Sequence, residues 1–350
     1  MSTPAAGDTS GRLHFIRGEK MSILTEIEHR AKAAYPKIIF PEADEPRILQ
    51  VAEQTALRKL AQPVLLGDAE AILALAAQTG VDLSGVTIIT PDDAVKADYA
   101  ARFAAEDPMM TEKMVLRKLR NPLYFAACAV HFHDADSFIA GYHYTTGEVI
   151  LAASTFIGRA ENVNTISSFN LVTIPGFEGG EQGSVIFTDV AVCVDPEPEQ
   201  LADIAMLAAD AGRKLLSWEP RVAFLSYSTK GSGESEKIRR ITDALSILQA
   251  RRPDLNADGE FQLEVALSAS AAQKKLEQVG DVAGQANVIV FPDLNAGNTN
   301  IKAVKLFSRA NSIGPILTGF REPISDLSRT GSLEHLLGTV ATVAALCRKA

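Results

Sequence analysis

Short apolar runs alternate with helix-length stretches along most of the chain. The run KIIF at residues 37–40 is of strand length, and residues 45–61 then place apolar side chains at three- and four-residue spacing, which predicts a helix. PVLLGD predicts a second strand, AEAILALAAQTG a helix closed by glycine, and VTIITP a third strand. Strands that alternate with helices of this length predict parallel βαβ units with right-handed crossovers. The expected fold class is therefore α/β.

The pattern changes near Ile157. Two apolar runs of strand length, NTISSFNLVTIP and GSVIFTDVAVCV, are joined by the glycine-rich segment FEGGEQG. Two strands around a short glycine loop predict an antiparallel hairpin inserted into a mainly parallel sheet. After it, the pattern predicts a helix over 199–216, a strand at RVAFLSYS and a helix that opens after TKGSGES.

The last sixty residues hold two units that run from an apolar strand through a polar turn into a helix, at Val288–Asn298 and Gly314–Arg329. Ligands of α/β proteins bind beyond the carboxyl ends of the strands, so the two turns are candidate walls of one pocket. The second turn ends with Ser328 beside Arg329, and a hydroxyl next to a guanidinium at a helix entrance predicts an anion site.

A second candidate anion site is the glycine-rich turn STKGSGES at 228–235, which precedes a helix. Its backbone N–H groups could bind an anion, with Lys230 adding charge, although its lysine precedes the glycines and the turn is not a Walker A sequence. A solvated turn between a strand and a helix is the alternative. Other common motifs are missing: the sequence contains no GxGxxG after the first strand, no HExxH and no GxSxG.

Composition limits the class of protein. A chain of 350 residues with 47% hydrophobic content can bury a large core, and at roughly 100 to 200 residues per domain two domains are expected. The sequence has no apolar run of about 18 residues, so no membrane span is predicted. The net charge of −9 argues against a broad nucleic-acid surface, which needs excess positive charge.

The cysteines and the first twenty residues bear on location. The three cysteines (Cys128, Cys193, Cys347) lie in apolar contexts without CxxC or Cys/His spacing, so neither a disulfide framework nor a metal site is predicted, and a cytoplasmic protein is expected. Residues 1–20 are polar and glycine-bearing, lack the apolar core of a signal peptide, and predict a disordered extension before the helix that follows Met21.

Several motifs together carry a family resemblance. In order along the chain they are PEADEPRIL, PVLLGD, FTDVAV, DPEPEQLADIA, PRVAFLSYSTKGS, FPDLNAGN and GPILTGFREPISDLSR. In this order and spacing they resemble the phosphate acetyltransferase/butyryltransferase family. The resemblance covers roughly Pro41 to Ala345, and the set is far more specific than any one of its motifs.

The resemblance implies a two-domain α/β fold of the isocitrate/isopropylmalate dehydrogenase-like type, with the active cleft between the domains. The first domain would comprise residues 21–162 and 318–350, and the inserted second domain, residues 163–317, would carry the contacts of a homodimer. The family reaction moves an acetyl group between coenzyme A and inorganic phosphate. Coenzyme A is a substrate there, and neither a metal nor a permanently bound cofactor is implied.

The reaction needs a base for the thiol, donors for the carbonyl oxyanion and cations for phosphate. By resemblance, Ser328 would donate to the oxyanion or phosphate and Arg329 would hold phosphate or the coenzyme, against the alternatives of a helix cap and a surface ion pair. Further substrate-binding candidates come from the other matched turns: Ser228, Thr229, Lys230, Asn298, Lys302, Thr145 and Thr146. For Lys302 a solvated helix lysine is an equal alternative.

The helix after DLSR departs from the family pattern. Family members carry an acidic residue there, placed to take the thiol proton, and the aligned residue of this chain is His335, while Thr330 replaces a glycine. If Ser332 caps this helix, His335 lies in the first turn, where the positive end of the helix dipole favours the neutral imidazole that accepts a proton. We therefore consider His335 as the base, with an exposed helix histidine as the alternative.

Two family arginines also lack counterparts. In the segment at 135–154, Leu151 stands at the arginine position and Ala140 at a serine position, and residues 104–109, which correspond to a second arginine-bearing segment, contain no basic residue. Each charge-assisted contact of this kind is worth about 1.5–3 kcal/mol. Compensating groups nearby are His143, Tyr144, Arg117 and Arg120.

Three functional hypotheses follow. The first is a phosphate acetyltransferase with altered substrate contacts, and the second is a phosphate butyryltransferase. The third is a relative that binds or senses acyl-coenzyme A without turning it over. The DLSR, STKGS and GN turns favour catalysis, whereas the replaced arginines and the replaced acid favour the sensor.

Overall fold

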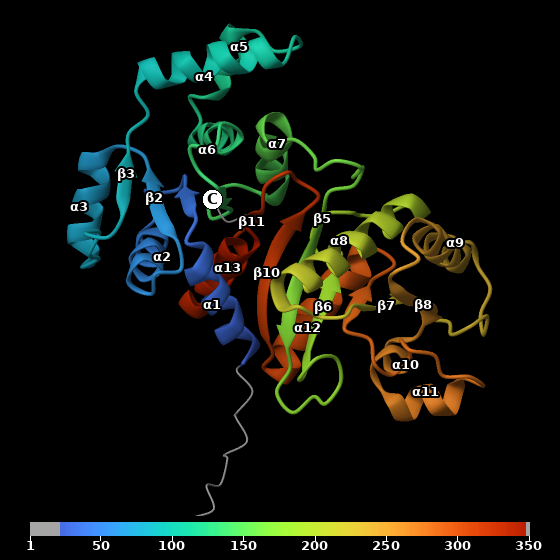
Figure 1. Cartoon of the computed structure of the whole chain (residues 1–350). Helices are drawn as coiled ribbons and strands as arrows, with labels where there is room; N and C mark the ends of the chain where they lie inside the picture. The colour runs from blue at the N-terminus through green and yellow to red at the C-terminus, as the bar shows by residue number, and fades with distance from the viewer. Residues whose placement is uncertain (1–21, 348–350) are drawn as a thin grey trace, which may run out of the picture.

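A mixed sheet is the framework of the computed structural model, which describes residues 22–347. Within this range the strands form one eleven-stranded sheet in the order β3-β2-β1-β4-β11-β10-β5-β6-β9-β7-β8 (Figure 1). The strands are β1 (Lys37–Phe40), β2 (Gln62–Leu66), β3 (Thr87–Ile89), β4 (Ser137–Ala140), β5 (Ser167–Thr173), β6 (Ser184–Thr188), β7 (Arg221–Leu225), β8 (Asn256–Phe261), β9 (Val288–Val290), β10 (Asn311–Thr318) and β11 (Ile324–Asp326).

Helices connect these strands as the alternating pattern predicts. They are α1 (Ile23–Ala34), α2 (Pro46–Leu57), α3 (Ala69–Thr79), α4 (Asp93–Glu106), α5 (Glu112–Lys118), α6 (Pro122–His131), α7 (Thr146–Phe156), α8 (Pro198–Leu216), α9 (Glu236–Arg251), α10 (Leu263–Leu267), α11 (Ala269–Lys275), α12 (Leu294–Ser308) and α13 (Leu333–Leu346). Among the described helices, none combines the length and the apolar character that crossing a membrane requires. The predicted extension, residues 1–20, lies outside the described residues.

The α/β prediction is confirmed, including the antiparallel insertion. β3, β2, β1, β4 and β11 pair in parallel on one side of the sheet, and β6, β9, β7 and β8 pair in parallel on the other. β5 and β6 form the expected antiparallel hairpin, with Phe169 opposite Thr188. β10 is antiparallel to both β11 and β5, so β10 and β5 together join the two parallel parts.

Local signals in the sequence explain where the helices begin and end. Asp68 caps α3 by accepting the N–H of Ala71, and Gly80 ends the helix in the left-handed conformation at φ +69°. Ser332 caps α13 in the same way, by accepting the N–H of His335. The predicted glycine stop and the predicted serine cap are both present.

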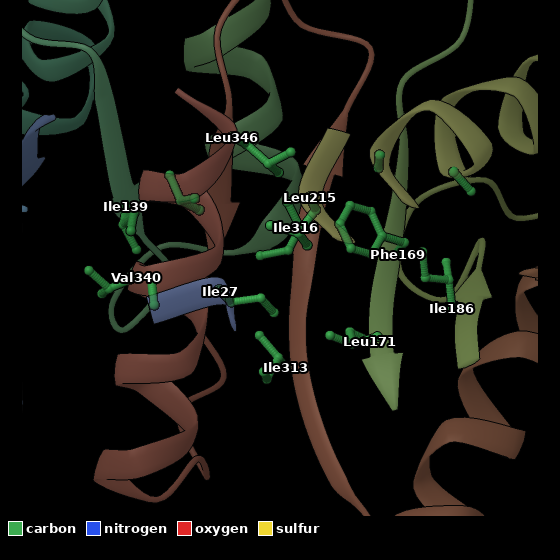
Figure 2. Packing of buried hydrophobic residues seen from close by; sticks show 14 of the residues in the cluster. Ile27, Ile139, Phe169, Leu171, Ile186, Leu215, Ile313, Ile316, Val340 and Leu346 are labelled. Atoms are coloured by element: carbon green, nitrogen blue, oxygen red, sulfur yellow. The ribbon is translucent and has the colours of Figure 1, made fainter. Parts of the chain in front are cut away.

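The largest buried cluster joins helices α1, α8 and α13 to the centre of the sheet. Ile27 of α1, Leu215 of α8 and Val340 of α13 belong to it, together with Phe169 of β5 and Ile316 of β10. Figure 2 shows Ile316 and Leu215 at β10 and Phe169 between the ribbons of β10 and β5, with Ile27 and Val340 on the side of β10 where α1 and α13 lie. This cluster holds β10 and α13 in place. In the sequence, β10 precedes β11 and the turn after it, and α13 follows that turn.

Truncation of Phe169 should destabilise the protein strongly. Its ring is fully buried, so Phe169→Ala leaves a cavity and should lower the free energy of unfolding by about 3–5 kcal/mol, measured by urea titration. Leu73→Ala on α3, where the side chain is 54% exposed, is the matched control and should change it by about 0.5 kcal/mol or less. A loss below about 1 kcal/mol for Phe169→Ala would contradict this packing.

Candidate active site

The site lies where three parallel strands end at one edge of the sheet. β1, β4 and β11 are neighbours, so the segments that follow them, residues 41–45, 141–146 and 327–332, meet beyond their carboxyl ends. A cavity of about 380 Å³ opens there between the second and third segments. It is lined by Gly141, Tyr144, Thr145, Thr146, Asp326, Leu327, Arg329 and Thr330.

Thr145 and Thr146 are fixed by the start of α7. The Thr145 hydroxyl accepts the N–H of Glu148 at 3.3 Å, and the Glu148 carboxylate accepts the N–H of Thr145 at 2.7 Å, which is a capping box. The Thr146 hydroxyl donates to Asp326 Oδ2 at 2.5 Å. The two threonines predicted as substrate contacts therefore lie at the cavity, and Thr146 is bonded to Asp326 of the DLSR turn.

Asp326 is a buried carboxyl group in the cavity wall. Burial raises its pKa to about 6 and the nearby Glu42 adds to the rise, while the hydrogen bond from Thr146 and the charge of Arg329 oppose it. Gly141 packs so closely that a Cβ there would lie 2.1 Å from Asp326 Oδ1. The carboxyl group thus titrates near neutral pH inside the site.

Arg329 reaches back over the loop after β4. Its Nε lies 3.4 Å from the carbonyl oxygen of Gly141 and its Nη2 lies 3.3 Å from that of Tyr144, which are long hydrogen bonds. Within residues 22–347, no carboxylate lies within ion-pair distance of this guanidinium, and the side chain lines the cavity. A guanidinium with two long hydrogen bonds and no carboxylate within 4.0 Å can bind an anionic ligand, although the charges of Asp326 and Glu148 act on it from farther away.

Ser328 lies in the turn beside this arginine. Its side chain is half-buried, and its hydroxyl is 3.3 Å from that of Thr330, which stands at the family's glycine position. Arg329 lines the cavity, whereas Ser328 is not among its lining residues, and the anion site expected from this pair stays a prediction. The role of Ser328 toward an oxyanion or phosphate stays a prediction.

His335 is buried, and the alternative of an exposed helix histidine is wrong. The residue is in the first turn of α13, 7% exposed, and Nε2 has no hydrogen-bond partner among the described residues. Burial lowers the pKa of His335, Lys305 lowers it further, and the backbone of Ser312 and Gly314 acts in the opposite direction. The neutral imidazole is favoured, mainly by desolvation.

The low pKa of His335 predicts a stability change with pH. Because the unfolded chain binds this proton more readily, the contribution of His335 to stability is present above about pH 6.5 and is lost as pH falls below it. We expect His335→Gln to flatten the fall in unfolding free energy between pH 7 and 5.5. His29→Gln, on the exposed face of α1, is the matched control. Equal slopes for wild type and His335→Gln would contradict the assignment.

The STKGSGES turn pairs with carboxylates of the same chain. Ser228 is 1% exposed and donates to Glu260 Oε1 at 2.8 Å, and Lys230 Nζ lies 2.5 Å from Asp258 Oδ1. Thr229 Oγ1 accepts the N–H of Gln262 at 3.0 Å. These donors are therefore occupied by the segment around β8, a long-range pairing that the local sequence does not reveal.

The other terminal turn lies away from the cavity. The Asn298 amide donates to the carbonyl oxygen of Val190 at 3.0 Å, and Lys302 is an exposed residue of α12. β6, β5 and β10 stand between β9 and β11 in the sheet, and the cavity lining includes no residue of 288–298. In this cavity the wall opposite the DLSR turn is the 141–146 loop, and the expectation that both terminal turns wall one pocket stays a prediction.

The replaced family positions lie near this loop. Leu151 is 55% exposed on α7, and Ala140 is buried at the end of β4. His143 Nε2 lies 3.3 Å from Asp44 Oδ1, and the Tyr144 hydroxyl donates to Asn121 at 3.0 Å. Compensation for the arginines by these groups stays a prediction.

Sequence reasoning missed Glu42, the most heavily bonded carboxylate of the site. It is 1% exposed and accepts four backbone N–H groups of residues 141–144. The signal available was a carboxylate directly after a buried strand, in KIIFPEA, at the strand end where ligands bind. Across residues 22–347, no group of three or more His, Cys, Asp or Glu side chains has a metal-binding arrangement.

Comparison with known proteins identifies the family. A family model described as phosphate acetyl/butaryl transferase matches residues 22–344. This chain belongs to that family. The resemblance inferred from the motifs is thereby confirmed, and it extends over nearly all of the described structure.

Individual members of the phosphate acetyl/butaryl transferase family are similar over their whole length. A phosphate acetyltransferase of Clostridium acetobutylicum is 38% identical over 324 residues, 92% of this chain and 97% of that protein. A phosphate acetyltransferase of Treponema pallidum is 38% identical over 328 residues, 92% and 97% of the two chains. The EutD phosphotransacetylase from Staphylococcus aureus superposes with a TM-score of 0.83 at 29% identity, covering 92% and 97% of the chains.

A more distant structure bears on the fold alone. The 4-hydroxythreonine-4-phosphate dehydrogenase from Klebsiella pneumoniae matches with a TM-score of 0.51 at 10% identity, over 89% of this chain and 99% of that one. The predicted dehydrogenase-like α/β fold is confirmed.

Proposed function

We propose that the chain is a phosphate acetyltransferase that moves an acetyl group reversibly between coenzyme A and inorganic phosphate, with no permanently bound cofactor. The observation that carries the proposal is Arg329, whose guanidinium lines the cavity with only two long hydrogen bonds, in a chain of this family. Phosphate and the coenzyme are both anions, and a planar guanidinium that forms no direct ion pair within residues 22–347 can bind either.

Residues at and beside the cavity can each serve a different step of acyl transfer. Arg329 holds phosphate against the thioester carbonyl, so that a phosphate oxygen attacks and the carbon–sulfur bond breaks. Ser328, in the same turn, donates to the carbonyl oxygen as negative charge develops. Thr145 and Thr146 support the opposite wall, with Thr146 held by Asp326.

In the reverse direction the coenzyme thiol must lose a proton. His335 remains our proposed acceptor, because Nε2 is unpartnered and the imidazole is kept neutral by burial. The 328–331 turn covers the ring: a Cβ on Gly331 would lie 2.6 Å from His335 Cδ2. Transfer to His335 therefore requires this turn to shift when the coenzyme binds.

A relative that binds acyl-coenzyme A without turnover is the second candidate. Two features favour this second candidate: the imidazole of His335 is covered, and Leu151 stands at a position where the family has an arginine. Phosphate butyryltransferase is the close alternative within the same chemistry, and no feature of the cavity distinguishes the two acyl groups.

One assay separates these functions. Purified protein is mixed with acetyl phosphate and coenzyme A, thioester formation is followed by absorbance, and the assay is repeated with butyryl phosphate. We expect thioester from acetyl phosphate at a higher kcat/KM. Faster turnover of butyryl phosphate would indicate a phosphate butyryltransferase. Binding of coenzyme A without turnover of either acyl phosphate would indicate the relative that only binds or senses acyl-coenzyme A.

We also propose the organisation implied by the family resemblance. Residues 21–162 and 318–350 would form one domain and residues 163–317 the other, with the second carrying the contacts of a homodimer. A cytoplasmic location is proposed because Cys128, Cys193 and Cys347 are all free thiols, without disulfide spacing in the sequence. Sedimentation of the purified chain tests the dimer.

A further inference from the structure

Four consecutive backbone N–H groups point to one buried carboxylate. Gly141 and Tyr142 donate to Glu42 Oε2 at 3.0 and 3.1 Å, and His143 and Tyr144 donate to Oε1 at 2.6 and 3.2 Å. Such a run of N–H groups forms a concave anion site of the kind that binds phosphate elsewhere. Here the anion is part of the protein, and its side chain comes from the end of β1.

Glu42 has no cationic partner among the described residues, so these four donors compensate its burial. Hydrogen bonds to an ionised carboxylate are about twice as strong as those between neutral groups. A buried carboxylate without them would be strongly unfavourable. The loop and the carboxylate therefore depend on each other for their conformation.

Strand pairing does not hold this loop. The parallel pairing of β1 with β4 ends at Ile39 opposite Phe138, and that of β11 with β4 ends at Asp326 opposite Ala140. Residues 141–144 continue beyond both ladders. At the point where the loop reaches the cavity, the Glu42 carboxylate accepts the backbone N–H groups that would otherwise pair with a neighbouring strand.

The same loop holds Arg329 on its carbonyl side. Gly141 and Tyr144 each donate an N–H to Glu42 and accept from the guanidinium through their carbonyl oxygens. The loop then continues into Thr145 and Thr146 at the cavity wall. A shift of the loop would move the carbonyl contacts of Arg329 and the threonine wall together.

We propose that Glu42 is a positioning residue for acyl transfer, which fixes the 141–146 loop through four backbone hydrogen bonds and thereby sets the position of Arg329 in the cavity. This inference rests on the proposed function for its effect on rate. Glu42 would act through the loop, because its 1% exposed carboxylate accepts the backbone N–H groups of residues 141–144.

Glu42→Gln is the sharpest test, because the amide has nearly the same shape but presents a donor to two of the four N–H groups. We expect kcat per folded molecule in the thioester assay to fall about 10- to 100-fold, since small misplacements in a catalytic site have effects of that order. The KM for coenzyme A should change less than about threefold. Glu70→Gln, exposed on α3, is the matched control and should retain wild-type kcat.

Amide hydrogen exchange supplies a readout that does not need activity. We expect residues 141–144 to exchange at least about tenfold faster in Glu42→Gln than in wild type, with the remaining strands unchanged. If Glu42→Gln does not fold, Glu42→Asp, which keeps the charge and shortens the reach, is measured instead and should show the same faster exchange and lower kcat.

The outcomes separate this inference from the proposed function. Unchanged exchange in the 141–144 loop would overturn the positioning role even in an active enzyme. If Glu42→Gln lowers the unfolding midpoint but the folded fraction keeps wild-type kcat, Glu42 contributes only to stability, and the positioning role is also overturned. A wild-type protein without turnover would instead contradict the proposed function, while the exchange measurement would still decide whether Glu42 fixes the loop.

Discussion

Replacement of Arg329 with glutamine should lower kcat/KM for phosphate about 100-fold in the direction that forms acetyl phosphate. The guanidinium lines the cavity, makes only two long contacts and has no carboxylate partner within residues 22–347, so its charge is available to the anion. A charge-assisted contact worth about 1.5–3 kcal/mol corresponds to roughly a 10- to 150-fold effect. Glutamine keeps two donors and removes the charge.

Steady-state kinetics with acetyl-coenzyme A and phosphate measure this effect. Arg329→Lys should give an intermediate loss, because a lysine retains the charge without the planar fork. Arg321→Gln is the matched control: Arg321 is an exposed arginine in the segment before β11 and lines a different cavity. Less than a threefold loss in Arg329→Gln would contradict the assignment of Arg329 to the anion.

Gly141→Ala should damage both the site and the fold. Gly141 has φ +125°, a conformation that other residues rarely adopt, and an added Cβ would lie 2.1 Å from Asp326 Oδ1 and 2.6 Å from the backbone nitrogen of Leu327. Backbone strain and overpacking each cost about 1–3 kcal/mol. We expect the free energy of unfolding to fall by about 2–4 kcal/mol and kcat to fall at least about 100-fold, because the 141–146 loop and the DLSR turn must separate.

Gly147→Ala is the matched control for this substitution. Gly147 lies in the first turn of α7, and an added Cβ there meets no atom within 4 Å. Alanine favours a helix over glycine by up to about 1 kcal/mol, so this variant should be as stable as wild type or slightly more stable. Urea titration and the thioester assay measure both variants. A Gly141→Ala protein with the stability and kcat of Gly147→Ala would contradict the close packing of the two segments.

The sequence predicts which segments form helices and strands better than it predicts which strands pair with each other in the sheet. Asp68, Gly80 and Ser332 mark helix ends by hydrogen bonds within one turn, and alternating apolar runs mark the strands, so these features can be inferred locally. The insertion of β11 and β10 between β4 and β5 depends on pairing between residues far apart in the sequence, such as Asn311 with Thr173 and Ser325 with Ile139. No local pattern specifies such pairing, and only the family resemblance pointed to a discontinuous arrangement.

The same distinction holds for the site. Ser328, Arg329, Thr145 and Thr146 belong to turns whose local chemistry indicates an anion site or a helix start, and the structure brings these two turns together. Other assignments depend on distant partners. In the local sequence Lys230 looks available to bind an anion, but in the structure it forms an ion pair with Asp258.

Burial is the second property that the local sequence hides. His335 occupies a helix start, which suggests exposure, yet β10 and the 328–331 turn cover its ring. Glu42 looks like an ordinary turn residue until residues 141–144, about one hundred positions later, bring four N–H groups to it. Both depend on tertiary packing, which periodicity and capping signals do not describe.

Isotope exchange tests the central claim most directly, because it requires phosphate and the acyl group to meet in one cavity. Radiolabelled inorganic phosphate is incubated with acetyl phosphate and the full-length protein, with and without coenzyme A, and label in acetyl phosphate is counted. Reversible acyl transfer predicts that label appears only when coenzyme A is present, and at a much lower rate in Arg329→Gln. Absence of label at saturating coenzyme A, with the coenzyme bound, would contradict the assignment of this cavity to acyl transfer.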